Sequence, residues 1–268
     1  MKIFNYDFMI RALIVGVLVS IIIPCIGTIA VNKRSSTIGD ALSHTSLAGV
    51  IIGLILGFNP IIGAIIICTI SAFGVEFLRK RMPKDSDLAT AIIMSFGIGL
   101  SAILSDFIPG TANLESFLFG SIVAIDKFET FLIIAIFIIV IVAFILMYKG
   151  MVYTIFDETG ARLAGVNTKA INNVFTLLMA LTISVASRIV GVLMISSLMV
   201  LPVAVGLKVS KSYLKTVIIS CILGVIYTIT GIFLSFYLNL KPGGVIVLIG
   251  VIVLSLVLIF DRKTIKNC

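Results

Sequence analysis

The chain has 268 residues, of which 60% are hydrophobic and only 12% are charged, and its mean hydropathy is +1.27. A soluble domain needs about twice that share of charged residues to cover its surface, so the composition excludes an ordinary soluble protein. A net charge of +8 would suggest nucleic acid as a partner of a soluble protein. Here the lysines and arginines fall between apolar runs, which indicates a membrane protein, and we expect no nucleic-acid partner.

Apolar runs of roughly the 20 residues that cross a bilayer recur along the chain. We therefore expect an all-α polytopic membrane bundle, with eight or nine transmembrane helices in one domain covering residues 1–268. The predicted spans are 10–31, 38–57, 60–78, 88–106, 128–148, 171–187, 189–207, 214–237 and 243–260. Residues 1–29 are expected to be a retained first span rather than a signal peptide. Arg188 indicates either a short external turn between two helices or an interrupted helix.

Charged or turn-forming residues separate the spans and predict their orientation. The breaks expected in the cytoplasm hold 15 of the 20 basic residues. These breaks are 33–34, 79–84, 149–169, 208–215 and 262–266, whereas Pro109-Gly110 is a break on the other side. The remaining basic residues are Lys2, Arg11, Lys127, Arg188 and Lys241. The C-terminus is therefore expected in the cytoplasm, with the N-terminus outside for nine spans and inside for eight.

The connection expected on the outer side is acidic. It contains four of the twelve acidic residues, which are Asp106, Glu115, Asp126 and Glu129, against the single Lys127. Such a surface either attracts cations and docks an external partner or is an ordinary solvated loop.

The only histidine, His44, follows Asp40 by four residues at the start of an apolar span. On a helix these two side chains share a face. Imidazole nitrogen and carboxylate oxygen suit zinc, manganese or ferrous iron. The pair is either a transient metal contact or a structural pair hydrogen-bonded to itself at a helix start. Two ligands make an incomplete site, but two copies facing each other would supply four.

A stripe of small residues lies beside this face of the same span. Gly49, Gly53 and Gly57 repeat at four-residue spacing, a pattern that lets membrane helices approach closely. The span therefore combines a face for polar ligands with a face for tight packing.

The longest polar interruption is the segment 153–165 on the expected cytoplasmic side. Phe156 and Leu163, seven residues apart, can share a face, and Asp157, Glu158 and Arg162 are polar. This pattern predicts a short helix on the membrane surface, suited to a groove of a cytoplasmic partner.

Catalytic motifs are lacking. The sequence has no phosphate-binding Gly-rich loop with lysine, and a single histidine leaves little scope for a catalytic set. Cys25, Cys68 and Cys221 are widely spaced within apolar runs and are interpreted as packing residues. We expect a transporter subunit rather than an enzyme, with no permanently bound cofactor.

Four ordered elements resemble the permease subunits of metal-ion ABC importers, the zinc, manganese and iron "ABC-3" family. The first is Ser36-Thr37-Ile38-Gly39-Asp40-Ala41-Leu42-Ser43-His44-Thr45-Ser46-Leu47-Ala48-Gly49. The others are Glu115 to Ile122, Phe156-Asp157-Glu158 with Ala161 and Gly165, and Val190 to Leu193 followed by Leu201-Pro202-Val203-Ala204. Ser46-Leu47-Ala48-Gly49 is most similar to the zinc branch, because the manganese branch is expected to carry a proline before that glycine.

The resemblance implies a homodimeric permease in the cytoplasmic membrane of a prokaryote, embedded in lipid. Two ATPase subunits would dock below, and an extracellular or periplasmic metal-binding protein would deliver the ion. Asp40 and His44 would contact the transported metal, and Phe156, Asp157, Glu158 and Gly165 would belong to the ATPase-coupling segment within 149–169. Family members have about eight spans, one fewer than the hydropathy count.

Two other classes of function are alternatives to this one. One is an ion-gradient-driven metal carrier that uses Asp40 as its cation or proton site and needs no ATPase. The other is a membrane anchor that transports nothing, which the Asp40/His44 pair disfavours.

Overall fold

The computed structural model describes residues 7–266 except 34, 109–113 and 121–125, and describes side chains between 9 and 260 with the same gaps and without 188 and 189. Parts of the predictions therefore lie outside the described residues: Arg34, the break at Pro109-Gly110, Ser121-Ile122 of the second family element, and Cys268. Within the described ranges all of the regular secondary structure is helical. The elements are α1 (Asp7–Asn32), α2 (Ile38–Leu56), α3 (Pro60–Arg81), α4 (Ser86–Ser105), α5 (Glu115–Phe119), α6 (Lys127–Phe156), α7 (Glu158–Leu163), α8 (Thr168–Ile189), the 3-10 turn η2 (Val192–Met194), α9 (Ile195–Val209), α10 (Tyr213–Leu238) and α11 (Pro242–Lys266).

Nine helices in the described ranges are long and apolar enough to cross a membrane. Each of the nine predicted spans corresponds to one of them, so the prediction of an all-α membrane bundle is confirmed. One boundary is wrong: the polar segment expected from 149 begins only at Asp157, because α6 continues as a helix to Phe156. The short α5 was not predicted.

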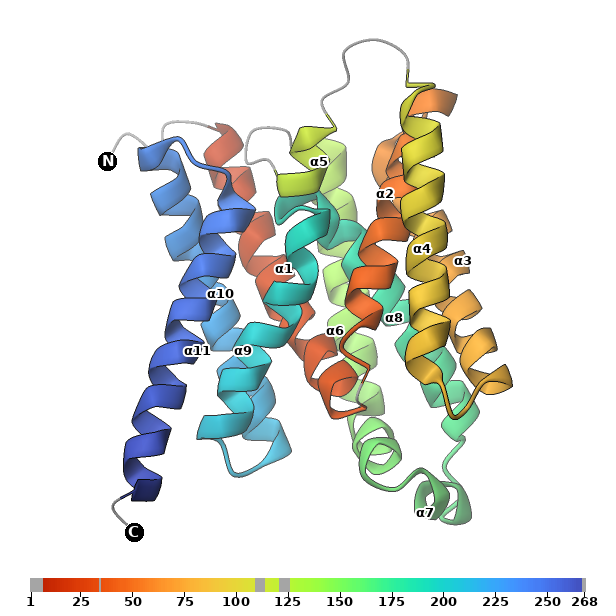
Figure 1. Ribbon diagram of the computed structural model, residues 1–268, viewed down its shortest axis with the longest axis vertical. Coiled ribbons are helices and arrows are strands. Elements are labelled where there is room, and N and C mark those ends of the chain that lie inside the picture. The colour runs from red at the N-terminus through yellow and green to blue at the C-terminus, as the bar shows by residue number, and fades with distance from the viewer. Residues whose placement is uncertain (1–6, 34, 109–113, 121–125, 267–268) are drawn as a thin grey trace.

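The bundle has two flanks joined by α1, α6 and α8 (Figure 1). Helices α2, α3 and α4 form one flank, and α9, α10 and α11 form the other. Helix α1 packs against α6, α8, α9 and α10, and its buried side chains recur at helical spacing, as at Val15, Val19, Ile22 and Ile26. This central packing holds α2 in position from one side.

The predicted glycine stripe of α2 packs closely against α3. A Cβ on Gly49 would overlap the backbone of Gly63, and one on Gly53 would lie 2.9 Å from the Cα of Pro60. Gly57 has another role: its φ of +73° ends α2 in the left-handed conformation that glycine adopts at little cost. The stripe is therefore confirmed as a packing face at two of its three positions.

Helices α8 and α9 are separate and meet at the upper end of the bundle (Figure 1). Gly191, with φ +90°, lies between them, and a Cβ there would overlap the backbone of residues 118–120. This contact fastens α5 to the α8–α9 connection. Arg188 itself lies in the last turn of α8, and the turn that separates the two helices follows at Val190 and Gly191.

Candidate functional site

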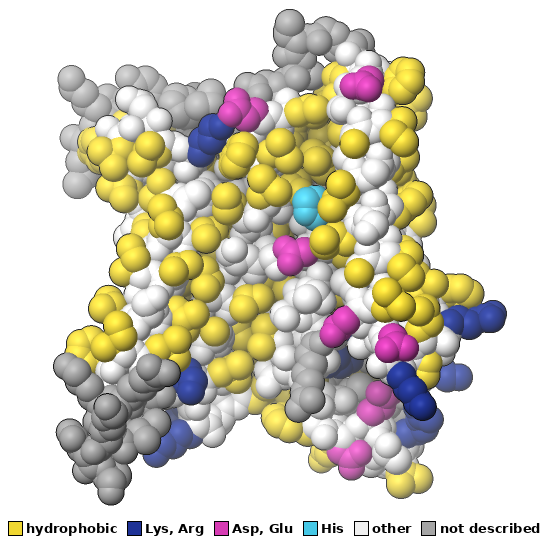
Figure 2. Space-filling view, viewed as in Figure 1, with side chains coloured by type: hydrophobic (Ala, Val, Ile, Leu, Met, Phe, Trp, Pro, Cys, Tyr) yellow, Lys and Arg dark blue, Asp and Glu magenta, His cyan; other side chains and the backbone are white. Residues whose placement is uncertain are grey.

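Helix α2 is buried on nearly all sides, and Asp40 and His44 mark its open face. From Ile38 to Ile51 every residue is buried except these two, which are half-buried. Asp40 lies in the first turn of the helix, where a carboxylate is favoured by the helix dipole. Figure 2 shows the single histidine near the middle of one face of the molecule, with an acidic side chain close by.

The other faces of α2 are occupied by neighbouring helices. Helix α3 meets Gly49, Ser46 donates its hydroxyl to Ser187 of α8 at 3.3 Å, and Gly97 of α4 meets Thr45. Ser101 of α4 also donates to the His44 carbonyl at 3.4 Å. These contacts leave Asp40 and His44 directed away from the bundle's packed interior.

Asp40 and His44 lack the hydrogen bond expected of a purely structural pair. In the described ranges no hydrogen bond joins their side chains. The side chains of Ser43 and Ser101 donate only to their backbone carbonyls, with Ser43 Oγ donating to the Asp40 carbonyl at 2.9 Å. In the same described residues, no further cysteine or carboxylate joins this pair to make a group of three metal ligands. One chain thus offers two unbonded ligands.

An apolar cluster separates this pair from the other end of α2. Leu47, Val50 and Ile51 of α2 pack with Phe117 of α5 and Val192 of η2. Phe117 is only 6% exposed although α5 is five residues long. The second family element therefore closes one end of the face on which Asp40 and His44 lie.

The predicted coupling segment contains a tightly built turn. Asp157 is extended and caps α7 by accepting a hydrogen bond from the Gly160 backbone N–H at 2.8 Å. Gly165, at φ +81°, ends α7, and Val166 N donates to the Ala161 carbonyl at 3.0 Å. Glu158 pairs with Arg162 across one turn at 3.7 Å.

The prediction that Phe156 and Leu163 share one helical face is wrong. Asp157 interrupts the helix between them, so Phe156 ends α6 and Leu163 ends α7. Both are strongly exposed, at 71% and 85%. Between the two helices lies an apolar groove of about 440 Å³, lined by Val152, Tyr153, Phe156, Asp157, Gly160 and Ala161.

The acidic connection is largely engaged in local structure. Asp126 and Glu129 form a reciprocal cap at the start of α6, and Glu129 is buried. Glu115 pairs with Lys241, the residue just before α11. Three of the four acids are thus accounted for by folding, which favours the ordinary-loop interpretation over a free cation-attracting surface.

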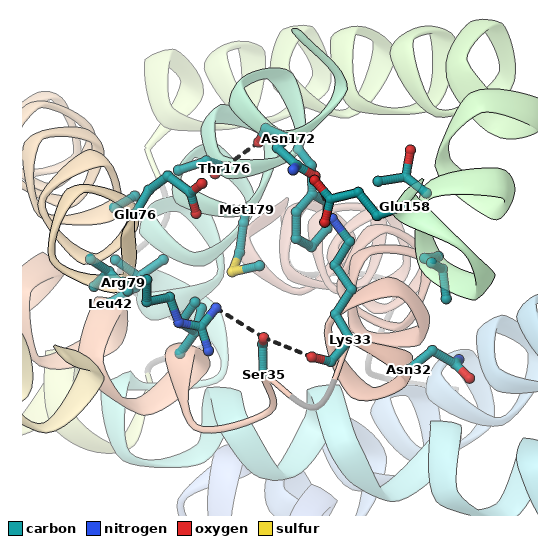
Figure 3. Close-up of a pocket in the computed structure, with 16 residues that line it drawn as sticks. Asn32, Lys33, Ser35, Leu42, Glu76, Arg79, Glu158, Asn172, Thr176 and Met179 are labelled. Atoms are coloured by element: carbon teal, nitrogen blue, oxygen red, sulfur yellow. Dashed lines mark hydrogen bonds between the residues drawn. The ribbon is translucent and has the colours of Figure 1, made fainter. Parts of the chain in front are cut away.

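A polar cavity of about 440 Å³ at the N-terminal end of α2 was not predicted (Figure 3). Lys33, Glu76, Arg79, Glu158 and Asn172 are among the residues that line it. Their separation in sequence, from 33 to 172, gave no local pattern by which to find it. It lies across α2 from Asp40 and His44, since Ile38 and Leu42 are its α2 lining.

The nine membrane-length helices in the described ranges make the chain a polytopic membrane protein. The model of the ABC 3 transport family matches residues 5–261, and the chain belongs to this family. Members are membrane permeases of ABC transporters and are not themselves ATPases, which confirms the expectation of a non-enzymatic subunit.

Relatives with similar sequences carry metal-transport names. The chain is 33% identical over 254 residues to the "Probable metal transport system membrane protein" of Treponema pallidum, covering 95% of this chain and 96% of that protein. It is 30% identical over 259 residues to the manganese transport system membrane protein MntC of Listeria monocytogenes, covering 97% and 92%.

Two solved structures have the same fold. One is PsaBC from Streptococcus pneumoniae in complex with Fab, with a TM-score of 0.86 and 25% identity over 96% of this chain and 92% of that chain. The other is an inward-facing metal-chelate type ABC transporter, with a TM-score of 0.77, 13% identity, and coverage of 96% and 87%. The second supports the fold alone.

Proposed function

We propose that the chain is the membrane permease of an ATP-driven importer of divalent metal ions, lying in the cytoplasmic membrane of a prokaryote with its C-terminus inside. One observation carries the proposal: Asp40 and His44 are the only residues from Ile38 to Ile51 that are not buried. Ionisable side chains within membrane spans are costly and mark ion pathways. Their lack of a mutual hydrogen bond leaves both available to an ion.

The site is proposed to be shared between two copies of the chain. Two ligands from one copy hold an ion incompletely, whereas Asp40 and His44 of both copies would give four. Weak coordination suits transport, because a conducted ion must also leave. The metal is cargo that contacts these residues briefly.

Manganese is the ion that we favour. Carboxylate oxygen and imidazole nitrogen accept manganese, iron and zinc alike. Relatives named as manganese importers are 27–30% identical to this chain over nearly its whole length. Zinc, predicted from Ser46-Leu47-Ala48-Gly49, is the alternative.

ATPase subunits are proposed to dock at α7 and the α6–α7 groove. Phe156 lines this groove and Leu163 ends α7, and both are strongly exposed, so this end of the bundle presents apolar surface to a partner. A metal-binding protein would deliver the ion at the opposite end of the bundle. Nucleotide-driven closure of paired ATPases would then alternate access to Asp40 and His44.

Import into liposomes tests the proposal. The chain, its ATPase and its metal-binding protein should import manganese when ATP is enclosed, and should fail when any one of the four is omitted. Competition by zinc at equal concentration ranks the two ions. Import by the chain alone that an uncoupler abolishes would instead establish the gradient-driven carrier.

A further inference from the structure

The polar cavity lies where six helices begin or end, namely α1, α2, α3, α6, α7 and α8, and its opposite walls carry charge. Glu76 and Arg79 of α3 line one wall, and Glu158 of α7 and Asn172 of α8 line the other. Figure 3 shows Lys33 entering from the α1–α2 connection between these walls.

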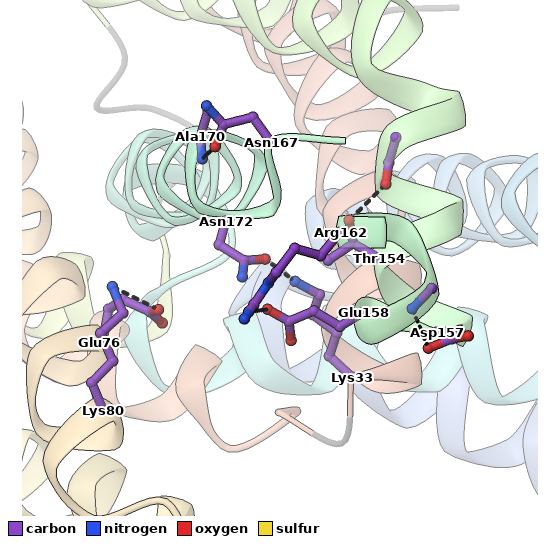
Figure 4. A network of polar contacts seen from close by, with 12 residues as sticks. Lys33, Glu76, Lys80, Thr154, Asp157, Glu158, Arg162, Asn167, Ala170 and Asn172 are labelled. Carbon is purple, nitrogen blue, oxygen red and sulfur yellow. Dashed lines mark hydrogen bonds and ion pairs between the residues drawn. The ribbon is translucent and has the colours of Figure 1, made fainter. Parts of the chain in front are cut away.

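Lys33 contacts α8, the helix that follows α7 and forms part of the same wall. Its Nζ donates to Asn172 Oδ1 at 2.6 Å and lies 5.2 Å from the ring centre of Phe175, both on α8. In both close-ups the carboxylate of Glu158 lies beside this amine (Figures 3 and 4). Burial lowers the pKa of Lys33, and the negative charges of Glu158 and Glu76 oppose that shift.

The backbone of Lys33 belongs to a short connection that ends in α2. Lys33 N donates to the Ile29 carbonyl at 2.9 Å, and Ser35 Oγ donates to the Lys33 carbonyl at 3.2 Å. The Ser35 carbonyl in turn accepts from the backbone of Ile38, the first residue of α2, at 3.2 Å. From Ser35, Asp40 is five residues away along the chain.

Arg79 holds the same connection from the other side. Its Nη1 donates to Ser35 Oγ at 2.9 Å, which ties the start of α2 to α3. The α1–α2 connection is therefore bonded to α3 through Arg79 and to α8 through Lys33. A movement of α7 that carries α8 with it therefore strains one of these two hydrogen bonds when α3 stays in place.

We propose that Lys33 is a positioning residue that passes the movement of α7 and α8 to the first turn of α2, and so to Asp40. The proposal rests on the proposed import function, because it concerns how nucleotide-driven motion reaches the metal contact. A hydrogen bond from a charged amine is stronger than a neutral one, which suits a contact that must hold while helices move. Asp40 then changes position when α7 and α8 move.

Coupling, rather than folding, is what the test must measure. The complete complex with ATPase and binding protein is reconstituted in liposomes, and manganese import and ATP hydrolysis are both recorded. Lys33→Gln should leave ATP hydrolysis within about twofold of wild type and lower the manganese imported per ATP roughly tenfold. Lys33→Arg, which keeps the charge and a donor, should recover part of that ratio.

Lys80→Gln is the matched control. Lys80 is an exposed lysine on α3 near the cavity, paired with Glu76 within one helix at 3.4 Å. Such surface pairs contribute little, so its import per ATP should equal that of wild type. Asn172→Ala removes the acceptor without altering Lys33 and should reproduce the Lys33→Gln defect, which covers the case in which Lys33→Gln does not assemble.

The proposal is overturned if import per ATP is unchanged in Lys33→Gln or Asn172→Ala, or if import and hydrolysis fall in proportion. A spin-label pair at Thr37→Cys and Thr159→Cys gives a readout that needs no import. Nucleotide binding should leave this distance distribution unchanged with Lys33 present and broaden it in Lys33→Gln; broadening in both would contradict the proposal. Absence of import by the wild-type complex, with this distance result retained, would refute the proposed function alone.

Discussion

Gly49 and Gly63 bring α2 and α3 together main chain to main chain, because a Cβ on either would overlap the backbone of the other. This contact sets the rotation of α2 about its own axis. Residues on the opposite side of the helix, Asp40 and His44, are thereby directed to the open face. Packing on one face of α2 thus determines the position of the ligands on another.

Gly49→Ala should destabilise the protein, since added volume at a backbone contact costs about 1–3 kcal/mol. The expected result is a thermal unfolding midpoint in detergent that is lower by roughly 5 °C. Gly99→Ala in α4 is the control: nothing lies within 4 Å of its added Cβ, so its midpoint should stay the same or rise. Equal effects of the two substitutions would contradict the close α2–α3 contact.

Cys25 and Cys221 offer a test of the packing of α1 against α10. Their sulfur atoms lie 3.5 Å apart although the residues are 196 positions apart in sequence. Mild oxidation with a copper–phenanthroline complex should join them, with two thiols losing two electrons and two protons to the oxidant. Peptide mass spectrometry should then find a Cys25–Cys221 disulfide and no disulfide at Cys68; failure to form it would place the two helices further apart.

Gly165→Ala should weaken the coupling segment. At φ +81° an alanine costs about 1–2 kcal/mol, whereas asparagine tolerates the left-handed conformation better. Co-purification of the ATPase with the permease should therefore fall in Gly165→Ala and be largely kept in Gly165→Asn. Identical retention of the ATPase by both variants would show that the α7 end is not part of its docking site.

A site shared between two copies predicts that the two His44 side chains lie close together. In a variant lacking all four native cysteines, His44→Cys should form a covalent dimer with a short thiol-specific cross-linker. Ser43→Cys, buried on the same helix, should remain monomeric under the same conditions. A monomeric His44→Cys in an otherwise intact dimer would exclude the shared site.

The features that followed from the sequence are those encoded locally. All nine spans were predicted because hydropathy reports membrane helices directly, and the Asp40/His44 spacing sufficed to place both residues on one face of α2. The end of α6 was misplaced because Lys149 and other polar residues can continue a helix beyond the apolar core. The five-residue α5 was missed because helices this short depend on tertiary packing, here that of Phe117.

The polar cavity lay beyond sequence reasoning for a different reason. The bond from Lys33 to Asn172 joins residues 139 positions apart, and only the fold brings them together. The interpretation of the acidic connection also depended on the fold, because Glu115 pairs with Lys241, which lies 126 positions away just before α11. Single-sequence patterns describe faces and ends of helices, whereas these pairs depend on how the helices are arranged.

The most direct test of the metal pathway is import by the Asp40→Ala, His44→Ala double variant. In liposomes with ATPase, binding protein and ATP, we predict that manganese import falls to background while ATP hydrolysis persists. Thr37→Ala, an exposed position near Asp40 on the same helix end, should import like the wild type. Unchanged manganese import by the double variant would contradict the account.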